Sequence, residues 1–168
     1  MATNNHCRLL LLCGWVAILG ACAPAVVHQW EDISPQNGMA WSQVSEVLSG
    51  DSVRLYDGQV IKYLGIQAPQ TGEPLFEQAR EANAWLLRQH RAVIQIAPGV
   101  TTKEGYPCAY VFAIYSQVKG VFCFVNKELL QFGYAQAEHS TEHQYREEFA
   151  RLEADAQRAK LGIWQSKP

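Results

Sequence analysis

Short segments in which apolar and polar residues alternate dominate the first half of the chain. One covers residues 44–48, and two more, 52–56 and 59–66, lie on either side of Asp57-Gly58. Alternation places every second side chain on one face, which is the pattern of a half-buried strand. An Asp-Gly pair between two such segments predicts a β-hairpin closed by a type I′ turn, in which both central residues have positive φ.

Three further strands are expected in the middle of the chain, at residues 92–97, 109–115 and 121–125. The last two flank a polar turn, and simple antiparallel register then places Cys123 opposite about residue 113. A disulfide between Cys108 and Cys123 would need a diagonal approach across this hairpin. The pattern leaves two interpretations open, a disulfide or two buried thiols that act as small apolar side chains.

Two segments with helical periodicity come before residue 134. The first follows Pro74, and much of its apolar stripe is expected from Ala82, Trp85, Leu86 and Leu87. The second covers residues 127–132, with Asn126 as the expected N-cap and Gly133 as the terminating residue.

A third helix is expected near the C-terminus. Residues 141–144 fit a T-x-x-Q capping box, which predicts that this helix begins at Thr141. The helix should end near residues 160–162, and the apolar Trp164 just beyond it is expected to pack back onto the domain. The order of three strands, a helix, three strands and two helices does not alternate as βαβ units do. It indicates an α+β fold with a small, strongly bent antiparallel sheet.

The composition agrees with one globular domain and a short appendage. The chain has 168 residues, of which 48% are hydrophobic and 18% are charged. These values exclude a disordered chain, and no internal repeat is present.

The appendage is the N-terminal segment. Arg8 precedes an uncharged apolar run from Leu9 to Leu19, which is short for a permanent membrane-spanning helix. The residues that follow, up to Cys22, resemble a bacterial lipobox, in which the cysteine is lipidated and becomes the first residue of the mature protein. We therefore expect a lipoprotein-type signal peptide at residues 1–21. An ordinary cleaved signal and an uncleaved anchor are the alternatives.

This interpretation predicts an exported lipoprotein, anchored to a membrane of a bacterial cell envelope through Cys22. Residues 22–40 contain the lipidated cysteine and a tether broken by Pro24, Pro35 and Gly38, and residues 41–168 form the domain. Residues 1–21 contain one basic residue and no acidic residue. The remainder therefore carries 13 basic and 16 acidic side chains, a net charge of −3. This balance does not favour nucleic acid as a partner.

Five segments, in order and with matching spacing, resemble the staphylococcal nuclease (thermonuclease) family. The resemblance extends over about residues 42–165 and implies an OB-type five-stranded antiparallel β-barrel with about three helices. One departure is a longer hairpin around residues 113–122. The segments are VLSGDSVRLYDGQVIKYLGIQAPQTGEP, FEQAREANAWL, TKEGYPCAYVFA, FVNKELLQFGYA and EFARLEADAQRAKLGIW.

The resemblance also implies a catalytic site with calcium, because family members that cut nucleic acid use this ion. Two acidic side chains hold the ion, a glutamate helps to activate water, and two arginines neutralise the phosphate. Here Asp51 keeps the first metal position, but Gln67 stands at the second. Gln70 replaces the glutamate, and Lys62 and Tyr106 replace the two arginines. We expect Tyr106 to fill the volume that an arginine would occupy.

These substitutions remove most of the required chemistry. An amide accepts no proton from water, and an ammonium lacks the bidentate fork of a guanidinium. We therefore expect a catalytically degenerate domain with no cofactor, acting in binding or assembly with an unidentified protein partner. Asp51 would then order the turn in which it lies. The alternative is a calcium-dependent nuclease of DNA or RNA with a rearranged acid set, in which Glu73 or Glu104 supplies the missing carboxylate.

A second motif points to another enzyme class. His139, Glu142 and His143 match H-x-x-E-H, a pattern of zinc peptidases. Zinc chemistry needs both histidines on one helical turn, whereas the capping box places the start of the helix between them. The motif is therefore expected to be a coincidence within a loop.

Overall fold

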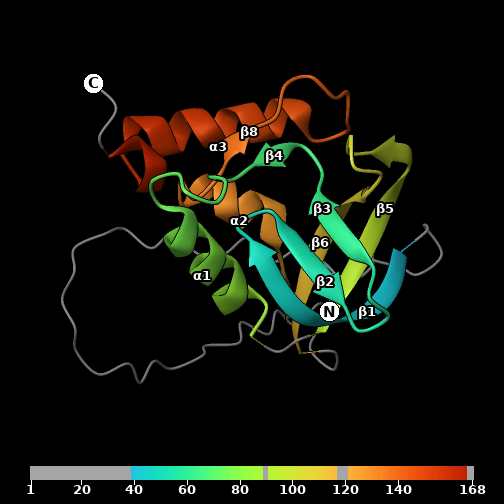
Figure 1. Ribbon diagram of the computed structural model, residues 1–168. Coiled ribbons are helices and arrows are strands. Elements are labelled where there is room, and N and C mark those ends of the chain that lie inside the picture. Colours follow the sequence, from blue (N-terminus) through green and yellow to red (C-terminus); the bar gives the residue numbers. More distant parts are fainter. Residues whose placement is uncertain (1–38, 89–90, 117–120, 166–168) are drawn as a thin grey trace, which may run out of the picture.

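The chain is described here from a computed structural model, which covers residues 39–88, 91–116 and 121–165. The expected signal peptide, Cys22 and most of the tether lie outside the described residues. Figure 1 shows a barrel of strands with helices on one side. The strands are β1 (Met39–Ser49), β2 (Ser52–Leu55), β3 (Val60–Tyr63), β4 (Ile66–Gln67), β5 (Arg91–Thr101), β6 (Pro107–Ser116), β7 (Val121–Phe124) and β8 (Gln136–Ala137).

Five of these strands form a closed ring. The order in the sheet is β3-β2-β1-β5-β6-β7, and β3 also pairs with β6. Every neighbour in the ring is antiparallel except this closing pair, which is parallel at Lys62↔Cys108 and Tyr63↔Ala109. The α+β class and the OB-type five-stranded barrel are confirmed. The extended hairpin adds β7 beyond the ring.

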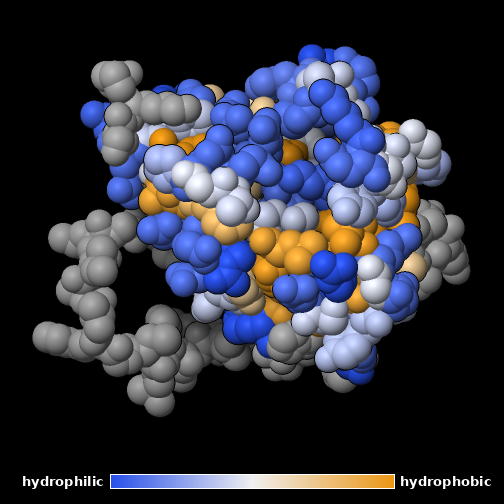
Figure 2. All heavy atoms as spheres, in the orientation of Figure 1, coloured by the Kyte–Doolittle hydropathy of each residue, from blue (hydrophilic) through white to orange (hydrophobic). Residues whose placement is uncertain are grey.

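Three α-helices complete the domain: α1 (Phe76–Leu86), α2 (Val125–Gln131) and α3 (Arg146–Arg158). A short 3₁₀ turn follows at Gly162–Trp164. Helix α1 contacts β1, and α2 packs between β6 and α3. Figure 2 shows an apolar area over the strands β1 to β3, whereas the outer surface of α3 is mostly hydrophilic. The buried hydrophobic residues come from the strands of the barrel and from the inner faces of the three helices, so the core lies inside the barrel and beneath the helices.

The Asp57-Gly58 hairpin is present, but its turn is not type I′. Only Gly58 has positive φ, +87°, and Asp57 does not. The Gly58 N–H donates to the Leu55 carbonyl at 2.9 Å, and the Leu55 N–H donates to the Gln59 carbonyl at 2.9 Å. This is a type I turn followed by a glycine in the left-handed region, the other common way to close a hairpin.

Two expected helix caps are wrong. Helix α2 begins at Val125, so Asn126 lies inside it. There Asn126 is fully buried and links strands, because its Oδ1 accepts from the Val111 N–H at 3.0 Å and its amide donates to the Leu64 carbonyl at 3.0 Å. Helix α3 begins at Arg146, five residues after Thr141, without a side-chain cap. In the segment before α3, the Glu138 carboxylate accepts hydrogen bonds from the backbone N–H groups of Ser140 and Thr141.

The two cysteines in the described part of the chain are free and buried. Ala113 lies opposite Cys123, as the simple register predicts. The interpretation of two buried, small apolar side chains is therefore confirmed for Cys108 and Cys123.

Candidate functional site

Asp51 lies in the turn between β1 and β2 and has no exposed surface. The Lys62 Nζ donates to its Oδ1 at 2.7 Å, and the Ser49 hydroxyl donates to the same oxygen at 2.7 Å. Its Oδ2 accepts from the Ala68 N–H at 2.8 Å. A buried carboxylate is tolerated when it is paired with a cation and hydrogen-bonded. Here the chain itself supplies the cation and the hydrogen-bond donors.

Local strand geometry places these groups together. Asp51 directly precedes β2, and the antiparallel pairing Ser52↔Lys62 sets Lys62 beside it on β3. Alternation along β3 buries Ile61 and Tyr63 in the core and leaves Lys62 partly exposed, with its ammonium directed at Asp51. The Asp51 carbonyl also accepts from the Tyr63 N–H at 2.8 Å.

Helix α1 is fixed to the same turn by Asn83. The Asn83 amide donates to the Ser49 carbonyl at 2.9 Å, and its Oδ1 accepts from the Tyr63 hydroxyl at 2.9 Å. Both side chains are buried, and burial raises the pKa of Tyr63 far above its usual value. Asp51 thus belongs to a buried polar network that joins β1, β3, α1 and the segment after β4.

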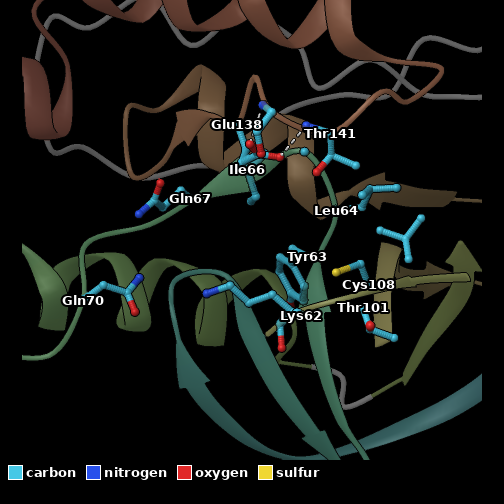
Figure 3. Close-up of a pocket in the computed structure, with 14 residues that line it drawn as sticks. Lys62, Tyr63, Leu64, Ile66, Gln67, Gln70, Thr101, Cys108, Glu138 and Thr141 are labelled. Atoms are coloured by element: carbon cyan, nitrogen blue, oxygen red, sulfur yellow. Dashed lines mark hydrogen bonds between the residues drawn. The ribbon is translucent and has the colours of Figure 1, made fainter. Parts of the chain in front are cut away.

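The two amides at the expected catalytic positions do not approach Asp51 as ligands. Gln67 and Gln70 are both exposed, and Figure 3 shows them at the same side of the cavity as Lys62. The Gln70 amide donates to the Ala68 carbonyl at 2.8 Å. No hydrogen bond to Asp51 from either glutamine occurs among the described contacts.

The two candidate rescue acids are engaged elsewhere. Glu73 accepts from the Gln70 N–H at 2.6 Å. Glu104 is exposed, and a hydrogen bond from the Thr102 side chain is the largest cause that lowers its pKa. Tyr106 is 43% exposed, and the expectation that it fills the volume of a missing arginine stays a prediction.

A cavity of about 400 Å³ opens beside this network (Figure 3). Its lining includes Lys62, Gln67, Gln70, Thr101, Cys108 and Glu138. Two of these six are Lys or Glu, and both already have partners within the chain. Lys62 pairs with Asp51, while Glu138 accepts from the N–H groups of Ser140 and Thr141. Partial burial raises the pKa of Glu138, but the bonds from these two residues outweigh it and lower the pKa overall.

The H-x-x-E-H motif does not form a metal site. His139 and His143 both precede α3 and have different partners: the Nε2 of His139 lies 3.5 Å from the Oε2 of Glu153, and the Nδ1 of His143 lies 3.1 Å from the Tyr110 hydroxyl. Within the described ranges, no three His, Cys, Asp or Glu side chains are placed to hold a metal ion. The geometry thus gives no support to zinc chemistry.

The residues around Asp51 do not fit calcium either. Calcium takes six to eight oxygen ligands, usually with several carboxylates. Asp51 is the single acidic group of the network, and an ammonium already lies on one of its oxygens. A second cation at that position would meet electrostatic repulsion from Lys62.

Sequence reasoning missed Ser49, Asn83 and the Ala68 N–H. A serine two residues before an aspartate is a detectable turn signal. Asn83 is a polar residue beside apolar ones in a helix, which could have marked a buried position. A backbone donor from a distant loop leaves no signal in the sequence.

A family described as staphylococcal nuclease homologue matches residues 60–166, which is more than half of the chain. No curated protein matches the chain.

Proposed function

We propose, on the premise that this chain belongs to the staphylococcal nuclease homologue family, that its domain has lost the nuclease reaction and acts in binding or assembly. The observation that carries this proposal is the ion pair between Lys62 and the buried Asp51. It gives the family's remaining acid an internal cation, so that the acid serves the fold instead of a metal ion.

The other substitutions support the same conclusion. Water near the cavity has no general base at position 70, because Gln70 is an amide and Glu73 bonds the Gln70 N–H. A missing base costs about 10²–10⁴ in rate. A missing preorganised donor to the transition state costs about 10²–10³. These losses do not simply add, but together they leave little of the reaction.

The alternative, a calcium-dependent nuclease with a rearranged acid set, requires a second carboxylate at Asp51. Glu73 would have to release the Gln70 N–H, and Glu104 would have to leave its bond with Thr102. A calcium ion at Asp51 would not favour either move, because the Lys62 ammonium already pairs with the Asp51 carboxylate. The proposal of a binding domain is therefore the better supported of the two.

The setting of the proposed function is a membrane surface in a bacterial envelope. It rests on the lipobox that ends at Cys22 and on the tether that follows. None of the helices in the described ranges is long and apolar enough to cross a membrane. In this proposal acyl chains hold the domain at the membrane, and its partner is another protein.

A comparison of two proteins tests the loss of activity. The parent, residues 23–168, is assayed with calcium on single- and double-stranded DNA and RNA. Beside it stands a variant that restores the family's residues, Gln67→Asp, Gln70→Glu and Tyr106→Arg with Lys62→Arg. We expect no cleavage by the parent above a protein-free control. Calcium-dependent cleavage by the parent that disappears in Asp51→Ala would refute the proposal, whatever the restored variant does.

A further inference from the structure

The last turn of α1 carries an exposed tryptophan stacked on an arginine. Trp85 is 62% exposed, although its place in the sequence suggested the apolar stripe of the helix. The Arg88 guanidinium carbon lies 4.4 Å from the centroid of the Trp85 ring and 4.6 Å from that of Tyr115 on β6. The guanidinium therefore contacts both aromatic rings. Trp85, Arg88 and Tyr115 are called the α1-end cluster below.

Hydrogen bonds fix the arginine in this position. Its Nη1 donates to the Trp85 carbonyl at 3.0 Å and lies 3.4 Å from the Tyr115 hydroxyl. That hydroxyl in turn donates to the Leu86 carbonyl at 3.0 Å. An arginine held in this way has already lost much of its side-chain entropy, so a ligand that binds to it incurs a smaller entropic cost.

The charge of Arg88 is not matched by an acid within the described ranges. Arg54, Arg80, Arg146 and Arg158 each form an ion pair with Asp or Glu there. Arg88, like Arg91 and Arg151, forms none in the described ranges, but Arg88 alone of these three is stacked on aromatic rings there. The hydrogen bonds described for Arg88 all use Nη1. Its Nε and Nη2 remain as the two donors of a fork that fits the two oxygens of a carboxylate.

We propose that the α1-end cluster binds a carboxylate side chain of a partner protein, an inference that rests on the proposed binding function. Trp, Tyr and Arg are the residues that most often dominate protein interfaces. Docking over Trp85 would bury a large apolar surface beside the ion pair, which stabilises a complex. The chain has a net charge of −2, which weakens attraction to a polyanion but affects a single carboxylate little.

The test follows the Nε–Hε signal of Arg88 and the indole signal of Trp85 by NMR in the purified chain without residues 1–22. The probe is a short peptide with one glutamate between two leucines, and the matched control peptide has glutamine there. Arg158, which pairs with Asp155, is the internal control. We expect saturable shifts at Arg88 and Trp85 with the glutamate peptide, about tenfold weaker binding of the glutamine peptide, and no change at Arg158.

Two variants separate the fork from the charge. Arg88→Lys keeps a cation but loses the fork, and we expect it to abolish the saturable response while leaving the melting temperature within a few degrees. Arg158→Ala should bind as the parent does. Equal shifts with both peptides, shifts reproduced by sodium chloride at the same ionic strength, or a stronger response to inorganic phosphate would each overturn the proposal. So would concentration-dependent shifts without peptide, which would make a second copy of this chain the occupant. None of these readouts depends on nuclease activity, so the two proposals can fail separately.

Discussion

The ammonium of Lys62 lies 2.7 Å from the Oδ1 of Asp51, and the aspartate has no exposed surface. The family resemblance places Lys62 at an arginine position and Asp51 at a calcium position. In this chain the Lys62 ammonium and the Asp51 carboxylate neutralise each other's charge. In the proposed function, two positions that serve a phosphate and a metal ion in the family's nucleases form instead an ion pair that stabilises the fold.

Removal of the lysine should therefore destabilise the domain strongly. Lys62→Met leaves the Asp51 carboxylate buried with hydrogen bonds but without a cation. Loss of one partner of a fully buried pair costs about 3–5 kcal/mol, and the 26% exposure of the Lys62 side chain sets the expected loss at or below the lower end of that range. Urea unfolding followed by circular dichroism measures the loss. The double variant Lys62→Met with Asp51→Asn should recover part of it. A single variant as stable as the parent would show that the pair contributes little.

The contact between Gly133 and the C-terminal segment gives a second prediction. Gly133 has φ +71°, and a Cβ there would lie 2.4 Å from the Leu161 carbonyl oxygen. Gly133→Ala should therefore be destabilised by more than the approximately 1 kcal/mol of a left-handed alanine alone. Gly72→Ala is the matched control, since Gly72 has φ +89° but open space around it. The idea fails if both variants melt at the same temperature.

Trp164 packs onto the domain as expected from the sequence, with 8% of its surface exposed. The Ile163 N–H beside it donates to the Gly133 carbonyl at 2.8 Å, which ties the 3₁₀ turn to the end of α2. A chain that stops after Gly162 should lose about 3–5 kcal/mol, the scale for removal of a large buried side chain. Thermal unfolding of the truncated and complete domains provides the comparison, and equal stability would exclude this docking role.

His143 predicts how stability depends on pH. Burial is the largest cause that lowers its pKa, and the nearby charges of Glu138, Arg146 and Glu142 modify the effect. The folded state then binds fewer protons than the unfolded state, in which a histidine has a pKa of about 6.5. The contribution of His143 to stability is complete above that pH and is lost as the pH falls through the lowered folded-state value.

The matched variant is His143→Gln, which cannot titrate in this range. The free energy of unfolding of the parent should fall more steeply between neutral and mildly acidic pH than that of His143→Gln. Parallel curves would mean that His143 titrates alike in both states.

The sequence predicts the order of elements well, because alternation and helical periodicity record which face is buried. It predicts local capping poorly. Asn126 is a residue type that often caps helices, but here its side-chain amide joins β6 to the segment after β3. Thr141 fits a capping box, yet its N–H donates to the Glu138 carboxylate and the helix begins only at Arg146. A long-range network overrides the local preference at Asn126, and a carboxylate three residues earlier does so at Thr141.

The candidate site, like the fold, could be predicted from the sequence only in part. The family resemblance assigns residues to the family's positions, and the expectation that Asp51 orders its turn agrees with the bond from the Ser49 hydroxyl to its carboxylate. The sequence does not reveal that Lys62 pairs with Asp51, because the register between β2 and β3 brings them together. Helical periodicity alone also placed Trp85 in the core, whereas the buried position belongs to Asn83, which bonds Ser49 and Tyr63. Hydropathy cannot distinguish a buried asparagine with two partners from an exposed one.

The most direct test of the central claim, that Lys62 and not calcium neutralises Asp51, is the melting temperature of the domain with millimolar calcium and with a chelator. A ligand at about a hundred times its Kd stabilises the folded state by about 2.7 kcal/mol, which a melting curve resolves easily. The account predicts the same melting temperature in both conditions. A clear rise with calcium that is absent in Asp51→Asn would contradict it, because the aspartate would then bind a metal ion in place of the lysine.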